Sequence, residues 1–194
     1  MPEIRIRYRN WIVATLLLGS LLPVVALSAA TRVEQRELDR AESALRESLA
    51  QSSQLPVALS RDEDHLSLRI AASALFEPDS TVLTSDALKQ PLLEAVLRLL
   101  KHRRTLAAQV AVFTDSIGGV TANQSFSAAR AKALGAALIA AGVPAARLYQ
   151  RGAGVSGALA DNETPEGRLE NRRLEIVIAP VRLAPIRLAP ATGP

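Results

Sequence analysis

The chain has 194 residues, enough for one domain with flanking segments, and its net charge is +4. It contains no cysteine, which excludes disulfides, thiolate chemistry and cysteine-ligated zinc, and its two histidines do not have metal-ligand spacing. No recognition motif or set of stacking aromatics accompanies the positive charge. We therefore expect no nucleic-acid partner, no metal and no cofactor.

Residues 11–30 form an uncharged, mainly apolar segment, WIVATLLLGSLLPVVALSAA. At about 1.5 Å per residue, a helix of this length spans about 30 Å, the thickness of a bilayer core. The preceding RIRYRN is positively charged and so is expected to stay in the cytoplasm. We predict a transmembrane helix within residues 1–30 that exports the rest of the chain. The alternative is a signal peptide cleaved near Ala30, after small residues.

Residues 31–60 are predicted to form a charged helical stalk followed by a linker. Leu38, Ala41 and Leu45 make a short apolar stripe at helical spacing. Three positions are too few to indicate a coiled coil. The stripe therefore favours a solvated stalk, and the alternative is the seam of a homodimer. The linker, which contains SSQLP, is expected to end at Pro56.

From about His65 onward the pattern is typical of strands alternating with helices. The strand-like runs are HLSLRIAAS, LAAQVAVF, RLYQRGAG and RRLEIVIA. The first helical run, LTSDALKQPLLEAVLRLLKHRR, has candidate N-caps at Thr84 and Ser85, and Pro91 is expected to kink it or delay its start. The second is ANQSFSAARAKALGAALIAAG. Residues 61–179 are thus predicted to form an α+β sandwich of order β-α-β-α-β-β, with helices on a small mixed sheet.

The last segment, residues 180–194, contains a near-repeat, VRLAP followed by IRLAP. Prolines at that spacing block regular hydrogen-bond ladders. We expect a proline-rich disordered tail.

The most informative stretch is FTDSIGGVTANQSFSAAR, residues 113–130, which has one acid near its start and one base at its end. Asp115 follows a predicted strand, and Asn123, Ser127 and Arg130 share one face of the next helix. The face expected to pack on the sheet carries Phe126, Ala129, Ala133 and Ala137. Three interpretations of the acid and the base are open: a structural ion pair, a clamp for a ligand with an ammonium and a carboxylate, or part of a catalytic site. Spacing alone favours the ion pair.

Four motifs follow one another between residues 66 and 178. They are LFEPDSTVLT; FTDSIG with the Asn and SAARA after it; AAGVPAARLYQRGAG; and DNETPEGRLENRRLEI. In this order they resemble the OmpA-like peptidoglycan-associated domain family. The last is similar to the family's most specific signature, Asn-x-Thr-x-Glu-Gly-Arg-x-x-Asn-Arg-Arg-(Val/Leu)-Glu.

The resemblance implies non-covalent binding of peptidoglycan through the meso-diaminopimelate of its stem peptides. In the family, the aspartate of the Thr-Asp motif holds the ammonium group and the arginine of Ser-x-x-Arg holds the carboxylate, which correspond to Asp115 and Arg130. Asn123 and Arg172 are implied as supporting contacts. Asp79, in the loop before the first helix, is implied as a weaker contact, chiefly through its backbone. The resemblance therefore favours the clamp over the ion pair.

One departure from the family pattern lies just before Thr-Asp. The family usually has Gly-His there, and this chain has Val112 and Phe113. Losing the glycine is expected to remove room for close backbone approach, and losing the histidine removes a polar partner. We expect altered or weakened ligand binding as a result.

Together these features predict a protein of the inner membrane with one membrane helix and a peptidoglycan-binding domain in the periplasm, tethering membrane to wall. Signal cleavage would instead leave it in the periplasm or at the outer membrane. We expect no enzyme, because Asp115 has no second acid nearby in the sequence for glycoside hydrolysis. The alternative is an accessory or anchoring subunit of an envelope machine, such as a secretion system or a stator-like complex, in which wall binding is secondary or lost and other envelope proteins are partners. An ion-conducting, stator-like helix is disfavoured because residues 11–30 contain no aspartate.

Overall fold

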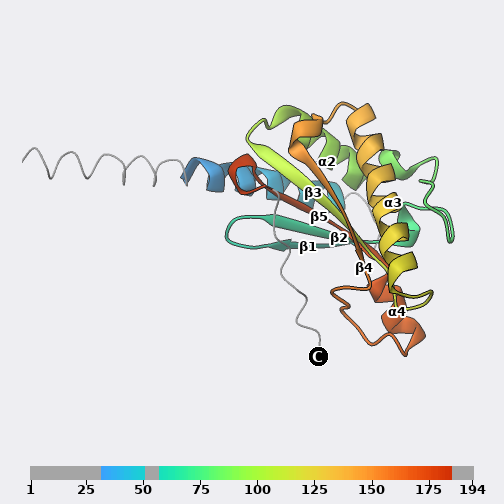
Figure 1. The fold of residues 1–194 in the computed structure, drawn as a ribbon. Helices are drawn as coiled ribbons and strands as arrows, with labels where there is room; N and C mark the ends of the chain where they lie inside the picture. The colour runs from blue at the N-terminus through green and yellow to red at the C-terminus, as the bar shows by residue number, and fades with distance from the viewer. Residues whose placement is uncertain (1–31, 51–56, 185–194) are drawn as a thin grey trace, which may run out of the picture. The chain divides into compact units, whose positions relative to one another are not determined.

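The computed structural model describes residues 32–50 and 57–184 (Figure 1). Its sheet has five strands in the order β1-β2-β5-β3-β4. The strands are β1 (Val57–Arg61), β2 (Leu66–Ala71), β3 (Leu106–Phe113), β4 (Leu148–Gly154) and β5 (Arg173–Pro180). All neighbours pair antiparallel except β3 and β4, which pair in parallel. The predicted α+β class with a small mixed sheet is therefore confirmed.

One face of the sheet packs against helices and carries the hydrophobic core. The helices besides the one at residues 32–50 are α2 (Pro91–His102), α3 (Val120–Ala140) and the short α4 (Pro165–Asn171) between β4 and β5. Alternate strand residues such as Leu68 and Ile176 share one buried cluster with Leu92 of α2 and Leu134 of α3. The core thus fixes α2 and α3 over one face of the sheet.

Residues 37–49 belong to this core, which corrects the prediction of a stalk. Leu38 and Leu45 are fully buried, Ala41 is nearly so, and all three lie in the core cluster. A short amphipathic stripe has the same pattern whether it meets solvent, a second copy or its own domain. Here its own domain covers it, so the stripe offers neither a solvated face nor a dimer seam.

The sheet also includes a strand, β1, most of which lies in the segment 31–60 that was predicted to be a stalk and a linker. β1 pairs with β2 from Val57 opposite Ile70 to Arg61 opposite Leu66. Five residues are too few for a clear alternation, which explains why the pattern missed this strand. The domain therefore includes residues on the N-terminal side of the predicted boundary at residue 61.

Three predicted segments fall wholly or largely outside the described residues. They are the membrane helix within residues 1–30, the SSQLP linker at residues 52–56, and the tail, of which only residues 180–184 are described. Pro180 ends β5, and Val181–Leu183 form a 3-10 turn. Across residues 32–50 and 57–184, no helix combines the length and the apolarity that a bilayer crossing requires.

α2 begins at Pro91, which agrees with the delayed start expected from that proline. Proline suits the first position of a helix because the backbone N–H it lacks would have no partner there. The N-cap is Gln90, which makes no side-chain capping bond, so the candidate caps Thr84 and Ser85 are wrong. A separate 3-10 turn, Ala87–Lys89, precedes the helix.

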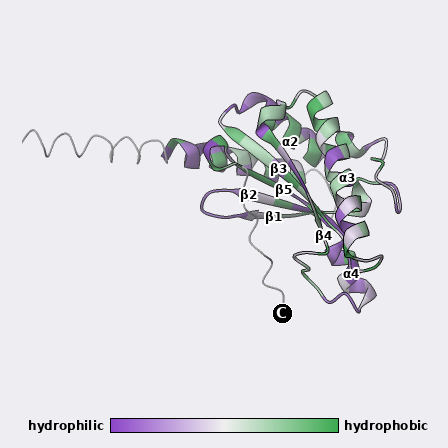
Figure 2. Ribbon diagram, viewed as in Figure 1, coloured by the Kyte–Doolittle hydropathy of each residue, from purple (hydrophilic) through white to green (hydrophobic). Residues whose placement is uncertain are grey.

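The buried face of α3 differs from the predicted face of Phe126 and Ala129, because Ala129 is exposed. The buried positions are Asn123, Ser127, Arg130, Ala131, Leu134, Gly135 and Leu138. This face is polar in the N-terminal half of the helix and apolar in the C-terminal half, as Figure 2 shows for the helix as a whole. Gly152 of β4 permits the close packing, since a Cβ there would lie 2.3 Å from the backbone nitrogen of Ala128.

Candidate ligand-binding site

A cavity of 600 Å³ opens beside the polar half of α3. Its walls come from four parts of the chain: residues 71–84, 113–117, 123–130 and 169–172. All five predicted site residues line it, namely Asp79, Asp115, Asn123, Arg130 and Arg172. The fold therefore brings together at one cavity side chains that are far apart in the sequence.

Asp115 stands just beyond the end of β3 and is only 7% exposed. Its Oδ1 accepts a hydrogen bond from the backbone N–H of Ile117 at 3.1 Å, and its Oδ2 accepts one from Nη1 of Arg172. Gly118 and Gly119, with φ of 91° and 84°, then turn the chain into α3. A carboxylate has about four lone-pair sites, so Asp115 can still accept a bond from an ammonium group.

Arg130 does not pair with Asp115. Its Nε donates to the carbonyl of Ser80 at 2.7 Å, and its guanidinium lies 4.3 Å from the ring centroid of Phe126 and 4.9 Å from that of Phe76. In the part of the chain that the structure describes, neither Nη1 nor Nη2 has a hydrogen-bond acceptor. The buried guanidinium of Arg130 thus has two terminal nitrogens whose N–H groups can still donate hydrogen bonds.

Burial lowers the pKa of Arg130, because the charged guanidinium loses water, and the carboxylate of Asp79 partly opposes this shift. An arginine remains charged at neutral pH even so. Asp79 itself is exposed and has φ of 46°, in the left-handed region that aspartate tolerates better than most residues. A carboxylate arriving at Arg130 would therefore meet a desolvated, fully charged partner.

Asn123 and Ser127 hold the walls of the cavity in place. Nδ2 of Asn123 donates to the carbonyl of Ile117 at 2.7 Å, which joins the loop after β3 to α3. The hydroxyl of Ser127 accepts from the N–H of Gly154 at 2.9 Å and donates to the carbonyl of Gln124 at 3.0 Å. These bonds explain why polar side chains occupy the buried face of α3.

The aromatic walls of the cavity were not predicted from the sequence. The chain has three phenylalanines, and all of them, Phe76, Phe113 and Phe126, line this cavity. Each lies within a few positions of a predicted site residue, and that clustering was a usable signal. Thr114 was missed too: among the described residues its buried hydroxyl has no hydrogen-bond partner.

The two residues that depart from the family pattern lie on opposite faces of β3. Val112 is fully buried in the core cluster and is not a wall of the cavity, so the expected loss of room at the missing glycine is not seen there. Phe113 does line the cavity, and the guanidinium of Arg173 lies 3.8 Å from its ring centroid. An apolar wall thus stands where the family usually has histidine.

Part of the chain matches the model of a known protein family. The model of the OmpA family matches residues 75–172, about half of the chain, and this range contains every predicted site residue. The chain belongs to the OmpA family, which confirms the resemblance of its motifs.

Individual relatives share the domain over different lengths. The chain is 34% identical over 125 residues to the probable lipoprotein YiaD of Escherichia coli K12. The matched region covers 64% of this chain and 56% of YiaD. It is 42% identical over 66 residues to the peptidoglycan-binding protein ArfA of Mycobacterium tuberculosis H37Rv, 34% of this chain and 20% of that protein. The solved structure of the cell wall anchor of the T6SS from Pseudomonas aeruginosa is 27% identical with a TM-score of 0.58, and the match covers 71% of this chain and 95% of that one. The chain spans about half the length, or less, of the curated relatives it matches.

Proposed function

We propose that this domain binds peptidoglycan non-covalently, by holding the free amino-acid end of meso-diaminopimelate between Asp115 and Arg130. The ligand carboxylate lies on Nη1 and Nη2 of Arg130, and the ligand ammonium lies on the carboxylate of Asp115. The state of Arg130 carries the proposal: it is buried, the carbonyl of Ser80 holds its Nε, and its terminal nitrogens lack acceptors among the described residues. A zwitterion supplies both charges that such a site needs.

The other predicted residues have supporting roles in this proposal. Arg172 holds the carboxylate of Asp115 in position through its Nη1. Asn123 fixes the loop that follows Asp115 and leaves its Oδ1, which has no partner within the described ranges, for the ligand ammonium. Asp79 places a negative charge near Arg130 and so helps to keep the guanidinium stable in its buried position.

Binding in this proposal occurs without hydrolysis. Glu77 and Asp79 line the cavity together with Asp115, so a second acid is nearer in space than the sequence suggested. However, both oxygens of Asp115 are already hydrogen bonded, to Ile117 and to Arg172. Incubation with sacculi should release no soluble fragments, and release of fragments would require an enzymatic account.

In the cell, we propose that residues 1–30 anchor the chain in the inner membrane, while the domain binds the peptidoglycan of the cell wall from the periplasm. The chain then acts as a tether between membrane and wall. The wall-binding functions named for ArfA and for the T6SS anchor support this proposal.

Sedimentation with purified sacculi tests the proposed site. The full chain in detergent should pellet with sacculi, and Arg130→Ala should bind about 10-fold to 150-fold more weakly, because a hydrogen bond to a charged group contributes about 1.5–3 kcal/mol. Arg151→Ala is the matched control, since Arg151 is an exposed arginine on β4 that does not line the cavity. Undiminished binding by Arg130→Ala would refute the proposed clamp.

A second candidate function is that of an anchoring subunit in an envelope machine. The match to the T6SS wall anchor favours it, because that match covers 95% of the anchor's chain. Crosslinking in cells, followed by mass spectrometry, distinguishes the two roles. A reproducible multi-span membrane partner would favour the machine, and crosslinks to peptidoglycan alone would favour the solitary tether.

A further inference from the structure

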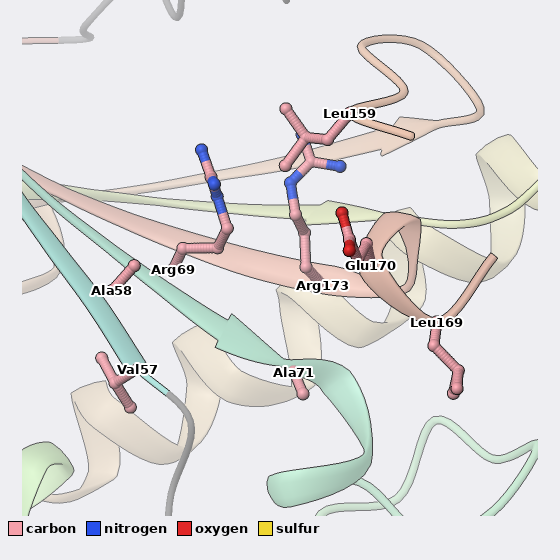
Figure 3. A pocket seen from close by; sticks show the side chains of 8 residues that line it. All are labelled: Val57, Ala58, Arg69, Ala71, Leu159, Leu169, Glu170 and Arg173. Carbon is pink, nitrogen blue, oxygen red and sulfur yellow. The ribbon is translucent and has the colours of Figure 1, made fainter. Parts of the chain in front are cut away.

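A second cavity borders the first one, on the side of β1 and β2. Its volume is 510 Å³ (Figure 3). Ala71 and Leu169 line both cavities, and Leu169 is 59% exposed. In Figure 3, Glu170 projects towards Arg173, whereas its neighbour Leu169 projects away from it. The two cavities therefore meet at the end of α4, around Leu169.

The second cavity has an apolar lining with charged groups beside it. Its apolar residues include Val57, Ala58 and Leu159, and its charged residues are Arg69, Glu170 and Arg173. Arg69 and Arg173 project to the same side of the sheet (Figure 3). Such a lining suits a small apolar group that carries a charge.

The two arginines of this cavity differ in what they can still bind. Arg173 is committed to the protein, since its Nε donates to Glu175 at 2.8 Å and its Nη2 donates to the carbonyl of Gly157 at 2.9 Å. Arg69 is half-exposed, and its Nε lies 3.6 Å from Oε1 of Glu175. Over the described ranges, neither terminal nitrogen of Arg69 has a hydrogen-bond acceptor. Arg69 is thus the cation that remains available to a ligand.

We propose that the second cavity is a subsite for the stem-peptide residue next to diaminopimelate, and that Arg69 binds the carboxylate of that residue. This proposal rests on the proposed function. Arg69 precedes the shared wall residue Ala71 by two positions on β2, which is about 7 Å along a strand. One further α-linked residue of an extended peptide covers about 3.3–3.6 Å, and a γ-linked residue, with two more carbon atoms in its path, reaches further. The carboxylate of that residue and the arginine side chain span the remainder. The apolar lining then contacts the aliphatic part of the same residue.

Two neighbours of diaminopimelate carry such a carboxylate: the γ-linked D-glutamate before it and a terminal D-alanine after it. Three ligands separate them: free meso-diaminopimelate, the tripeptide L-Ala-γ-D-Glu-meso-diaminopimelate, and the tetrapeptide that ends in D-alanine. Calorimetric titration of the full chain in detergent should show about 10-fold or greater tightening for the ligand that reaches Arg69, as one charge-assisted hydrogen bond predicts. A gain already in the tripeptide identifies the glutamate carboxylate, and a gain only in the tetrapeptide identifies the alanine carboxylate.

Variants separate the subsite from the clamp. Arg69→Gln should keep the affinity for free diaminopimelate and lose the gain of the longer peptide, whereas Arg130→Ala should weaken binding of all three ligands. Ala58→Glu is a second variant that keeps Arg69 in place and offers it a carboxylate from the opposite residue of β1. It should have the effect of Arg69→Gln. Arg151→Gln is the matched control and should bind all three ligands as the unmodified chain does.

The outcomes distinguish failure of the subsite from failure of the proposed function. If the unmodified chain binds all three ligands equally, or if both Arg69→Gln and Ala58→Glu retain the peptide gain, the subsite is wrong and the clamp stands. If the unmodified chain binds none of the three, the clamp and the subsite that rests on it are both wrong.

Discussion

The surroundings of Arg130 and of Arg173 are two regions of the molecule that look alike and differ in one respect. Both arginines are buried, 7% and 3% exposed, and both stack on phenylalanine rings. Burial lowers the pKa of each guanidinium. Arg173, however, donates from all three nitrogens, to Glu175 and to two backbone carbonyls, whereas Arg130 donates only from Nε, to Ser80.

The difference teaches that burial and charge alone do not mark a binding site in this domain. A guanidinium whose donors are all used by the protein holds loops and strands together. A guanidinium with unused donors at the wall of a cavity can still donate to a group from outside the chain. The comparison therefore predicts opposite consequences when each arginine is replaced by an apolar side chain of similar length.

The largest expected effect is that of Arg173→Met on stability. The replacement leaves Glu175 buried without its main partner, so the free energy of unfolding should fall by about 3–5 kcal/mol. Because Nε of Arg69 lies 3.6 Å from Oε1 of Glu175 and partly replaces the lost charge, we expect a value near the lower end of that range. Urea denaturation measures it, and a loss below about 1 kcal/mol would contradict a structural role for Arg173.

A purely apolar loss sets the scale for this comparison. Leu45→Ala removes a fully buried side chain from the core, so unfolding should become easier by about 2–5 kcal/mol while the binding cavity is unchanged. Glu47→Ala, at an exposed position of the same helix, should change stability by less than about 0.5 kcal/mol. If both variants had equally small effects, residues 37–49 would be a stalk after all.

The smallest expected change in stability is that of Arg130→Met. Its charge is buried without a full set of partners, and replacing such a charge by an apolar group is often neutral or stabilising. We expect the free energy of unfolding to stay constant or to rise by up to about 1 kcal/mol, while binding to sacculi weakens as in Arg130→Ala. A loss of stability as large as that of Arg173→Met would make the two arginines equivalent and remove the basis of the comparison.

Much of the fold follows from local patterns in the sequence. The run LAAQVAVF has the same bounds as β3, and Pro91 begins α2, because a buried strand and a helix-starting proline are local signals. Residues 37–49 and β1 depend instead on which surface lies opposite them, and no local pattern contains that information. The prediction of the buried face of α3 was wrong for a related reason. A helix rich in alanine has little contrast between apolar and polar faces, and its buried Asn123 and Ser127 are polar.

The sequence predicted which residues line the candidate cavity better than it predicted their pairings, and their binding role stays a prediction. Motif order placed Asp115, Arg130, Asn123, Arg172 and Asp79 together, and all five line one cavity. The sequence could not indicate that Asp115 pairs with Arg172, because that contact depends on how the chain after α4 returns to the end of β3. The same is true of the phenylalanine rings around Arg130, which come from two separate segments.

The central claim is tested most directly by competition between two stem tripeptides that differ in one carboxylate. One ends in meso-diaminopimelate, and the other has lysine in its place, so it keeps the side-chain ammonium and lacks the carboxylate beside it. If the terminal nitrogens of Arg130 bind that carboxylate, the diaminopimelate peptide should displace the protein from sacculi at a concentration at least about 10-fold lower than the lysine peptide. Equal displacement by the two peptides would contradict the account.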